Sequence, residues 1–247
     1  MDLGLTGRTA IVCGASSGIG LGIAESLAGE GANVVMFARR KELLEREAER
    51  IGGLAVAGDV TSAEDLERLV GAAVDTYGGV DILVNNSGGP PRTTASQLDA
   101  AKVESAVRLL LVSIVNLTGL CLPHLERSPA GRLVTVTSST VREPIDSLAL
   151  SNTVRPGIVG WSKSLARELG PKGITVNCVA PGRIDTDRIR EVYPDGPTAD
   201  DLATIPLRRL GTTREIGDVV AFLCSERASY VSGTVALVDG ALTRGLW

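Results

Sequence analysis

Short apolar runs alternate along this chain with segments of helical periodicity, and this alternation limits the possible fold more than any other feature. Strands that lack polar alternation are covered on both faces, as in a parallel sheet between two layers of helices. We therefore expect an α/β fold with a doubly wound parallel sheet and helices on both faces. Six runs are expected as strands: Thr9–Cys13, Asn33–Phe37, Asp81–Val84, Arg132–Thr137, Ile174–Val179 and Thr234–Val238.

The chain length indicates one domain. With 247 residues and 44% hydrophobic content, the chain can bury a large core without splitting, so we expect a single domain over residues 1–247. The stretch from Tyr193 to Pro206 breaks the alternation, because it holds three prolines, a glycine and several acidic residues. We expect a mobile surface loop that acts as a substrate lid over residues 190–211.

Charge and hydropathy narrow the choice of partners. The formal net charge is -4 and no basic tract follows the pattern that tracks a phosphate backbone, so no nucleic acid is expected. The longest apolar stretch, Leu109 to Leu122, is interrupted by polar residues and is shorter than the ~20 residues of a membrane span. We expect a buried or interfacial helix there and no membrane association.

Cysteine and histidine usage bears on compartment and metal. The N-terminal sequence lacks the charged leader and apolar core of a secretory signal, and no cysteines pair as CxxC, so a reducing, cytoplasmic location is expected. His124 is the single histidine, so no metal site is expected. The scattered cysteines are Cys13, Cys121, Cys178 and Cys224.

Two helices are expected to begin with a capping box, in which a Ser or Thr hydroxyl and a Glu three residues later satisfy free amides. Thr61 and Glu64 precede one apolar helical pattern, and Thr212 and Glu215 precede another.

A glycine-rich turn follows the first expected strand and opens a helical pattern. It reads Gly14-Ala15-Ser16-Ser17-Gly18-Ile19-Gly20, with the spacing G-x3-G-x-G. Glycines in this position let the backbone approach a pyrophosphate, while the free amides of the helix receive its charge. The strand, turn and helix context predicts a Rossmann-like nucleotide site, and the alternative is a purely structural turn.

These residues resemble a family pattern when they are taken with Asn85-Asn86-Ser87-Gly88 and Pro181-Gly182, each of which follows a later strand. The chain resembles the short-chain dehydrogenase/reductase family over nearly its whole length, and its 3-oxoacyl-ACP reductase-like members in particular. Two positions depart mildly from the family pattern: Ser87 stands for an alanine and Cys13 for a threonine.

The resemblance implies a nucleotide site at the carboxyl ends of the strands. Asp59 and Val60, after the third strand, are expected to flank the adenine, with Asp59 accepting a hydrogen bond from its amino group; the alternative is an aspartate that caps a turn. The expected cofactor-binding residues in these segments are Gly14, Ser16, Ser17, Gly18, Ile19, Gly20, Asp59, Val60, Asn86, Ser87, Gly88, Pro181, Gly182 and Ile184.

The end of the second strand sets the choice of dinucleotide. A carboxylate there would bind a ribose 2′-hydroxyl, whereas the chain has Ala38-Arg39-Arg40. An arginine fork suits a phosphate, so NADP(H) is preferred and NAD(H) stays possible. Against NADP(H), Ser17 stands where many NADP-using relatives carry a second basic residue. The two arginines could also cap a helix that begins at Lys41.

The catalytic positions of the family are only partly matched. The resemblance implies a serine, a tyrosine, a lysine and an asparagine, and aligning the chain carries these roles to Ser138, Ser151, Arg155 and Leu110. Only Ser138 matches, and its alternative reading is a loop serine that caps its neighbours.

Ser151 cannot take over the acid role of a phenol, because an alkyl hydroxyl is a far weaker acid. Arg155 keeps a positive charge that can hold the cofactor ribose and stabilise an oxyanion. Pro156 favours a first-turn position, so we expect this helix to begin near Asn152 or Thr153. Tyr193 is the strongest candidate for a replacement proton donor, while Tyr77 and Tyr230 are weaker candidates and His124 is expected to be structural.

Together these features predict an NAD(P)(H)-dependent oxidoreductase that interconverts a small carbonyl compound and an alcohol through an atypical site. The alternatives are a dinucleotide-binding regulatory protein and a non-redox lyase on the same scaffold. Arg142, Glu143 and Arg183 fall at the expected ligand edge and are compatible with an anionic or polar substrate. The apolar stripe around Leu109 to Val115 and Trp161 indicates a homo-oligomer, a tetramer or a dimer.

Overall fold

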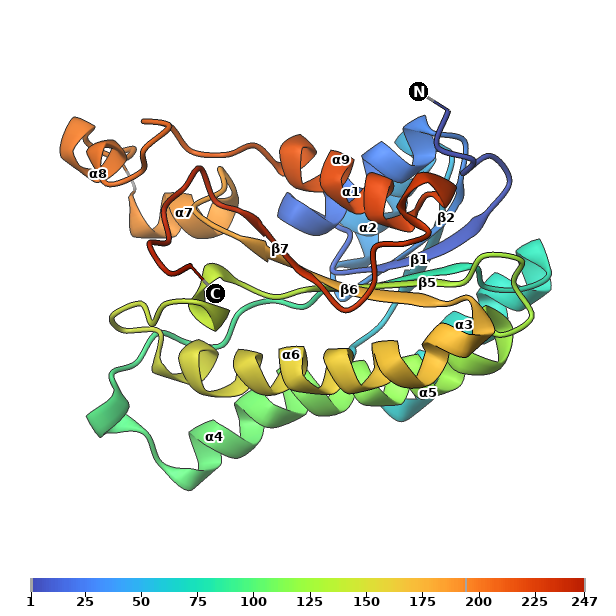
Figure 1. The fold of residues 1–247 in the computed structure, drawn as a ribbon, viewed down its shortest axis with the longest axis horizontal. Coiled ribbons are helices and arrows are strands. Elements are labelled where there is room, and N and C mark those ends of the chain that lie inside the picture. The colour runs from blue at the N-terminus through green and yellow to red at the C-terminus, as the bar shows by residue number, and fades with distance from the viewer. Residues whose placement is uncertain (1, 194, 247) are drawn as a thin grey trace.

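A computed structural model describes residues 2–193 and 195–246 (Figure 1). The strands are β1 (Thr9–Cys13), β2 (Asn33–Ala38), β3 (Leu54–Ala57), β4 (Ile82–Asn85), β5 (Arg132–Val136), β6 (Thr175–Pro181) and β7 (Val235–Val238). The helices are α1 (Gly18–Gly29), α2 (Lys41–Ile51), α3 (Ala63–Tyr77), α4 (Ala100–Val107), α5 (Ser113–Leu125), α6 (Ala149–Leu169), α7 (Asp187–Val192), α8 (Ala199–Ala203) and α9 (Thr213–Cys224). Short helical turns are η1 (Ala95–Gln97), η2 (Arg108–Val112), η3 (Ser139–Val141), η4 (Gly170–Lys172) and η5 (Glu226–Ala228).

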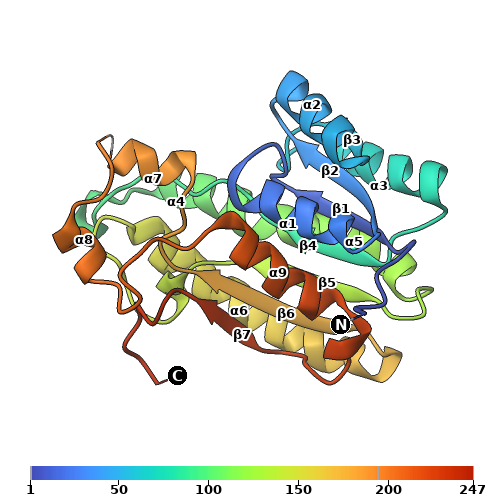
Figure 2. The same ribbon diagram turned by 90° about the horizontal axis from the view of Figure 1, so that it is seen from above.

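The seven strands form one sheet in the order β3-β2-β1-β4-β5-β6-β7, and all neighbouring pairs are parallel (Figure 2). In the register, Ile11 of β1 lies between Val35 of β2 and Leu83 of β4. The chain reverses its direction of winding between β1 and β4, and open α/β sheets bind ligands at the carboxyl ends of strands beside such a point. The doubly wound fold expected from the apolar runs is confirmed, and the bounds of each expected strand agree to within two residues.

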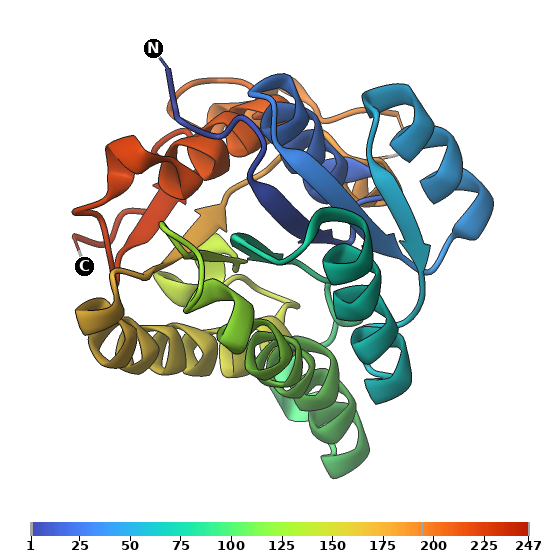
Figure 3. The same ribbon diagram turned by 90° about the vertical axis from the view of Figure 1, so that its right-hand side faces the viewer.

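Two helical layers cover the sheet, as Figure 3 shows from one side. Helices α1, α2 and α9 pack on one face around Leu27, Leu44 and Val220, whereas α3, α5 and α6 pack on the other around Leu69 and Leu117. Helices α1 and α9 approach so closely that a Cβ on Gly217 would lie 2.4 Å from the carbonyl oxygen of Gly22. Burial on both faces explains why the central strands carry almost no polar side chains.

The caps of two helices differ in how well the sequence predicted them. Helix α9 begins with the expected capping box of Thr212 and Glu215. Helix α3 is capped by Ser62, whose hydroxyl accepts from the Asp65 amide, so the expected box of Thr61 and Glu64 is wrong by one residue. Thr61 is instead held by Asp59, whose carboxylate accepts from both its amide and its hydroxyl.

Helix α6 begins at Ala149, three residues before the earliest start expected from Pro156. Proline inside a helix removes one backbone hydrogen bond, which opposes this extension. Burial of Leu150, Val154 and Ile158 on one face favours it, because tertiary packing overrides local propensity. The earlier start places Ser151 and Arg155 on the same helical face, four residues apart.

Helices α4 and α5 run on through the π-helical turn η2 as one helix, Ala100–Leu125. By length and composition alone this helix could cross a membrane, since its mean hydropathy is 1.9 over an 18-residue window and it is longer than the apolar stretch picked out in the sequence. Core helices of globular proteins pass the same test, and here Leu117 and Cys121 pack under the sheet while Val112 and Val115 are exposed.

The segment expected as an irregular lid is partly helical. Helices α7 and α8 lie within or beside residues 190–211, and α8 has its own capping box of Thr198 and Asp201. The two short helices were not predicted from the sequence; at α8, the local capping box favours the start of the helix. Pro194, within the expected lid, lies outside the described residues.

Candidate active site

Two cavities lie at the carboxyl edge of the sheet and meet at Asn86, Ser87 and Gly89. The nucleotide cavity, about 310 Å³, is lined by the glycine-rich turn, the end of β2 and Asp59. The substrate cavity, about 300 Å³, is lined by the loop after β5, the start of α6 and the segment after β6. Together they form one long cleft that crosses the point where the winding of the sheet reverses.

The glycine-rich turn is packed too tightly for side chains. A Cβ on Gly20 would lie 2.1 Å from the carbonyl oxygen of Gly14, and one on Gly14, where φ is +63°, would lie 2.6 Å from the Asn86 side chain. The side-chain amide of Asn86 donates a hydrogen bond to the main-chain carbonyl of Cys13 at 3.1 Å, and this bond connects the end of β4 to the turn. This packing brings the first turn of α1 to the cleft, where free amides can receive a phosphate.

Arg40 turns back toward the glycine-rich turn. Its guanidinium donates to the hydroxyls of Ser17 and, at 3.4 Å, Ser16. Helix α2 does begin at Lys41, but the Arg40 side chain makes no capping hydrogen bond to it. Arg39 lines the same cavity, so two guanidinium groups border the nucleotide cavity at the end of β2.

Asp59 lines the nucleotide cavity and also caps a turn. Its Oδ1 accepts from the amide of Thr61 at 2.8 Å and from its hydroxyl at 2.7 Å, and these bonds hold the pKa of the carboxyl below its usual value. The two readings of Asp59 are therefore compatible, since one oxygen fixes the turn while the residue borders the cavity with Val60.

Ser138 stands at the mouth of the substrate cavity, directly after β5 and Thr137. Its hydroxyl oxygen accepts from the amide of Thr140 at 3.2 Å. Ser138 therefore caps the turn that follows it, which was the alternative interpretation of this residue. Its hydroxyl can still donate its proton to a ligand.

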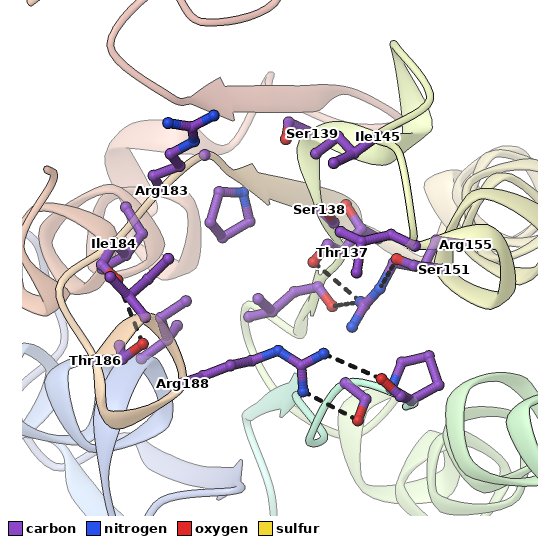
Figure 4. Close-up of a pocket in the computed structure, with 18 of the residues that line it drawn as sticks. Thr137, Ser138, Ser139, Ile145, Ser151, Arg155, Arg183, Ile184, Thr186 and Arg188 are labelled. Atoms are coloured by element: carbon purple, nitrogen blue, oxygen red, sulfur yellow. Dashed lines mark hydrogen bonds between the residues drawn. The ribbon is translucent and has the colours of Figure 1, made fainter. Parts of the chain in front are cut away.

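Ser151 and Arg155 form a buried pair on α6, beside Ser138 (Figure 4). Arg155 Nε donates to Ser151 Oγ at 3.1 Å, and the Ser151 and Thr140 hydroxyls are also 3.1 Å apart. Arg155 Nη1 donates to the main-chain carbonyls of Val136 and Thr137 at 3.2 and 3.0 Å. These bonds fix the guanidinium against the end of β5.

The charge of Arg155 is not neutralised by a carboxylate within 4 Å among the described residues, although the side chain is only 7% exposed. Burial, and then the nearby charge of Arg188, lower its pKa to about 10. The guanidinium therefore remains a cation near neutral pH and gives the substrate cavity a positive potential.

The remaining candidates are spread over the molecule. Of the tyrosines, Tyr193 lines the substrate cavity, whereas Tyr77 packs against the core and Tyr230 is fully exposed. His124 lies near the end of α5, just before β5 starts, and thus at the opposite edge of the sheet. Leu110 is completely buried in η2.

The segment after β6 contributes Pro181, Gly182, Arg183 and Ile184 to the substrate cavity. Arg142 and Glu143 do not line it; the Glu143 carboxylate accepts from the amide of Arg244.

Sequence reasoning missed several cavity residues, among them Arg92, Thr186 and Arg188. Arg188 donates to the carbonyls of Gly89 and Pro90 at 3.3 and 3.0 Å, so it bridges the cleft from α7 to the loop after β4. Nothing in its local sequence distinguishes it from Arg190, which is exposed and paired with acidic neighbours.

A family model described as enoyl-(acyl carrier protein) reductase matches residues 14–243, nearly the whole chain. The chain belongs to the short-chain dehydrogenase/reductase family. This short-chain dehydrogenase/reductase is 36% identical to the 3-oxoacyl-(acyl-carrier-protein) reductase FabG of Vibrio cholerae, over 97% of this chain and 99% of that protein. It is also 36% identical to dehydrogenase/reductase SDR family member 4 of Sus scrofa, over 96% and 87% of the two chains.

Solved structures of reductases resemble this short-chain dehydrogenase/reductase closely. The L-sorbose reductase of Gluconobacter frateurii, crystallised with NADPH and L-sorbose, superposes with a TM-score of 0.90, at 31% identity and over the full length of both chains. YwfH, an NADPH-dependent reductase involved in bacilysin biosynthesis, gives a TM-score of 0.92 at 26% identity, over 97% of this chain and 99% of that one.

Proposed function

We propose that this protein is an NADP(H)-dependent oxidoreductase that interconverts a small carbonyl compound and an alcohol. The observation that carries the proposal is the continuous cleft, which joins a glycine-rich turn and two arginines at one end to Ser138 at the other. The NADPH-bound L-sorbose reductase and the NADPH-dependent YwfH support this choice of cofactor by their likeness.

The residues present fit such a cofactor. Asn86, Ser87 and Gly89 line both cavities, so one elongated ligand can occupy the two together. In the proposal the amides at the start of α1 receive the pyrophosphate, Arg39 and Arg40 the 2′-phosphate, and Asp59 the adenine amino group. Arg155 holds the nicotinamide ribose. When bound, NADP(H) supplies or accepts the hydride.

Proton transfer is the unusual part of the proposal. Ser138 donates a hydrogen bond to the substrate oxygen, and Arg155 stabilises negative charge on it electrostatically. We assign Ser151 and Arg155 to the family positions of tyrosine and lysine, and Leu110 to that of asparagine. A guanidinium stays protonated near pH 7, so water or Tyr193 completes the proton transfer.

Three further expectations form part of the proposal. The segment 190–211, with α8, acts as a lid over the substrate cavity, since Tyr193 already lines it. The exposed Val112 and Val115 on the long helix support a homo-oligomer, a dimer or tetramer, with this face at the contact. Four free, buried cysteines are compatible with the expected cytoplasmic location.

A labelled-cofactor experiment tests the proposal. The protein is incubated with NADPH that carries deuterium at both C4 positions of the nicotinamide and with a library of small ketones and aldehydes. We expect deuterium in the product alcohols, detected by mass spectrometry. Tight NADPH binding without transfer would instead indicate a regulatory protein, and turnover that is independent of any dinucleotide would indicate a lyase.

A further inference from the structure

The substrate cavity is lined by four arginines and, among its described lining residues, by no aspartate or glutamate. Among the described side chains, which leave out those of Glu191 and Val192, no carboxylate lies within 4 Å of any of the four guanidinium groups. Like charges crowded without counter-charges repel each other, and the effect of Arg188 on the pKa of Arg155 reports this repulsion. The arginines are Arg92, Arg155, Arg183 and Arg188.

Three of these arginines are held in place by hydrogen bonds to other groups of the protein. Arg92 donates to the Ser147 hydroxyl, and Arg183 donates to the carbonyl of Asp201 and the hydroxyl of Thr204. Arg155 is fixed against the end of β5 by its bonds to main-chain carbonyls.

Arg188 differs because it reaches across the cleft, where its partners are two main-chain carbonyls on the opposite wall. Each terminal nitrogen donates one hydrogen bond, to the carbonyl of Gly89 or of Pro90, and the side chain is exposed enough to move. Figure 4 shows it reaching across the opening below Arg155. A carboxylate or phosphate would offer the same fork two charged acceptors, which form stronger hydrogen bonds than neutral carbonyls.

We propose that the substrate carries an oxyanionic group, a carboxylate or a phosphate, beside its carbonyl, and that Arg188 binds this group. The inference rests on the proposed oxidoreductase function and narrows its substrate class. The cofactor pyrophosphate is the other possible anion, but its receiving amides lie at the start of α1, and Arg188 lines the substrate cavity and not the nucleotide cavity. Arg155, inside the cavity, adds a positive field that attracts the anion.

Binding to the NADP⁺ complex tests this without depending on turnover. Calorimetry compares 4-oxopentanoate with its methyl ester, and hydroxyacetone phosphate with hydroxyacetone. We expect the anion of at least one pair to bind about tenfold or more tightly than its neutral partner. Arg188→Gln should remove this preference, while Arg190→Gln, a charge lost from the same helix outside the cavity, should keep it.

Several outcomes would overturn the inference. These are equal affinities within both pairs, no binding of either anion at millimolar concentration, or a preference that survives in Arg188→Gln. Weaker NADPH binding by Arg188→Gln with an unchanged preference would assign the arginine to the cofactor instead. Failure of the unmodified protein to bind NADPH is a separate result, and it would overturn the proposed function itself.

Discussion

The nucleotide cavity and the substrate cavity are built in different ways. The first depends on main-chain geometry where the phosphates are proposed to bind, in the tight turn of Gly14 and Gly20 that opens α1. The second gathers side chains from three distant segments, represented by Ser138, Arg155 and Arg188. A backbone-built site tolerates few substitutions, whereas a side-chain site can change its chemistry one residue at a time. We propose that this chain keeps the first kind of site and differs from its family in the second.

The largest effect is expected from adding a side chain inside the glycine-rich turn. Gly20→Ala places a Cβ against the Gly14 carbonyl, so the turn must open, at about 1–3 kcal/mol. We expect NADPH affinity, measured by fluorescence titration, to fall by as much as about 150-fold, which corresponds to about 3 kcal/mol. Gly29→Ala, at the other end of α1 with nothing within 4 Å, should bind NADPH normally. Normal binding by Gly20→Ala would contradict a backbone-built site.

A second prediction concerns the buried cation of the substrate cavity. Arg155→Met removes the charge that stabilises a developing oxyanion, and kcat should fall about 100-fold. Lys163→Met, which removes an exposed charge further along α6, is the matched control and should leave kcat unchanged. If kcat survives in Arg155→Met, the arginine has no electrostatic role in catalysis.

The third prediction concerns the preference for NADPH over NADH. Arg40→Gln removes a charged donor at the Ser16 and Ser17 hydroxyls, where the 2′-phosphate is proposed to bind. NADPH affinity should fall about tenfold while NADH affinity changes little. Arg46→Gln, on the outer side of α2, should change neither. An equal loss for both dinucleotides would show that Arg40 acts only on the fold of the turn.

The smallest effect is expected for the stability of the fold, at Glu215 in the first turn of α9, the helix that packs against α1. Hydrogen bonds from Arg209 and from the Thr212 amide lower the pKa of Glu215 to about 2. Because the pKa is lower in the folded state, this stabilisation is complete above about pH 4.5 and is lost as the pH falls toward 2.

Glu215→Gln should therefore lower the free energy of unfolding by about 0.5–1 kcal/mol at pH 7, and by less near pH 3, in denaturant titrations. Glu45→Gln, on the exposed face of α2, is the control. A pH-independent difference would show that the charge of Glu215 is not involved.

The sequence by itself determined six of the seven strands of the sheet, all except β3, and the glycine-rich turn. Both follow from local signals: uninterrupted apolar runs that only a two-sided burial explains, and glycine spacing between a strand and a helix. The fold and the capping box at Thr212 were predictable for the same reason. The start of α6 was not, because the penalty for Pro156 is local while the compensating burial of Leu150, Val154 and Ile158 comes from the rest of the molecule.

Only the tertiary structure decided which charges meet in the cleft. Arg188 looks like an ordinary surface residue in the sequence, yet it crosses to the loop after β4. Arg40 was expected at the nucleotide site, but its hydrogen bond to the Ser17 hydroxyl was not. Their directions depend on where α2 and α7 begin relative to strands that lie far away in the chain. Electrostatic interactions depend on distance in space, whereas the sequence fixes only distance along the chain.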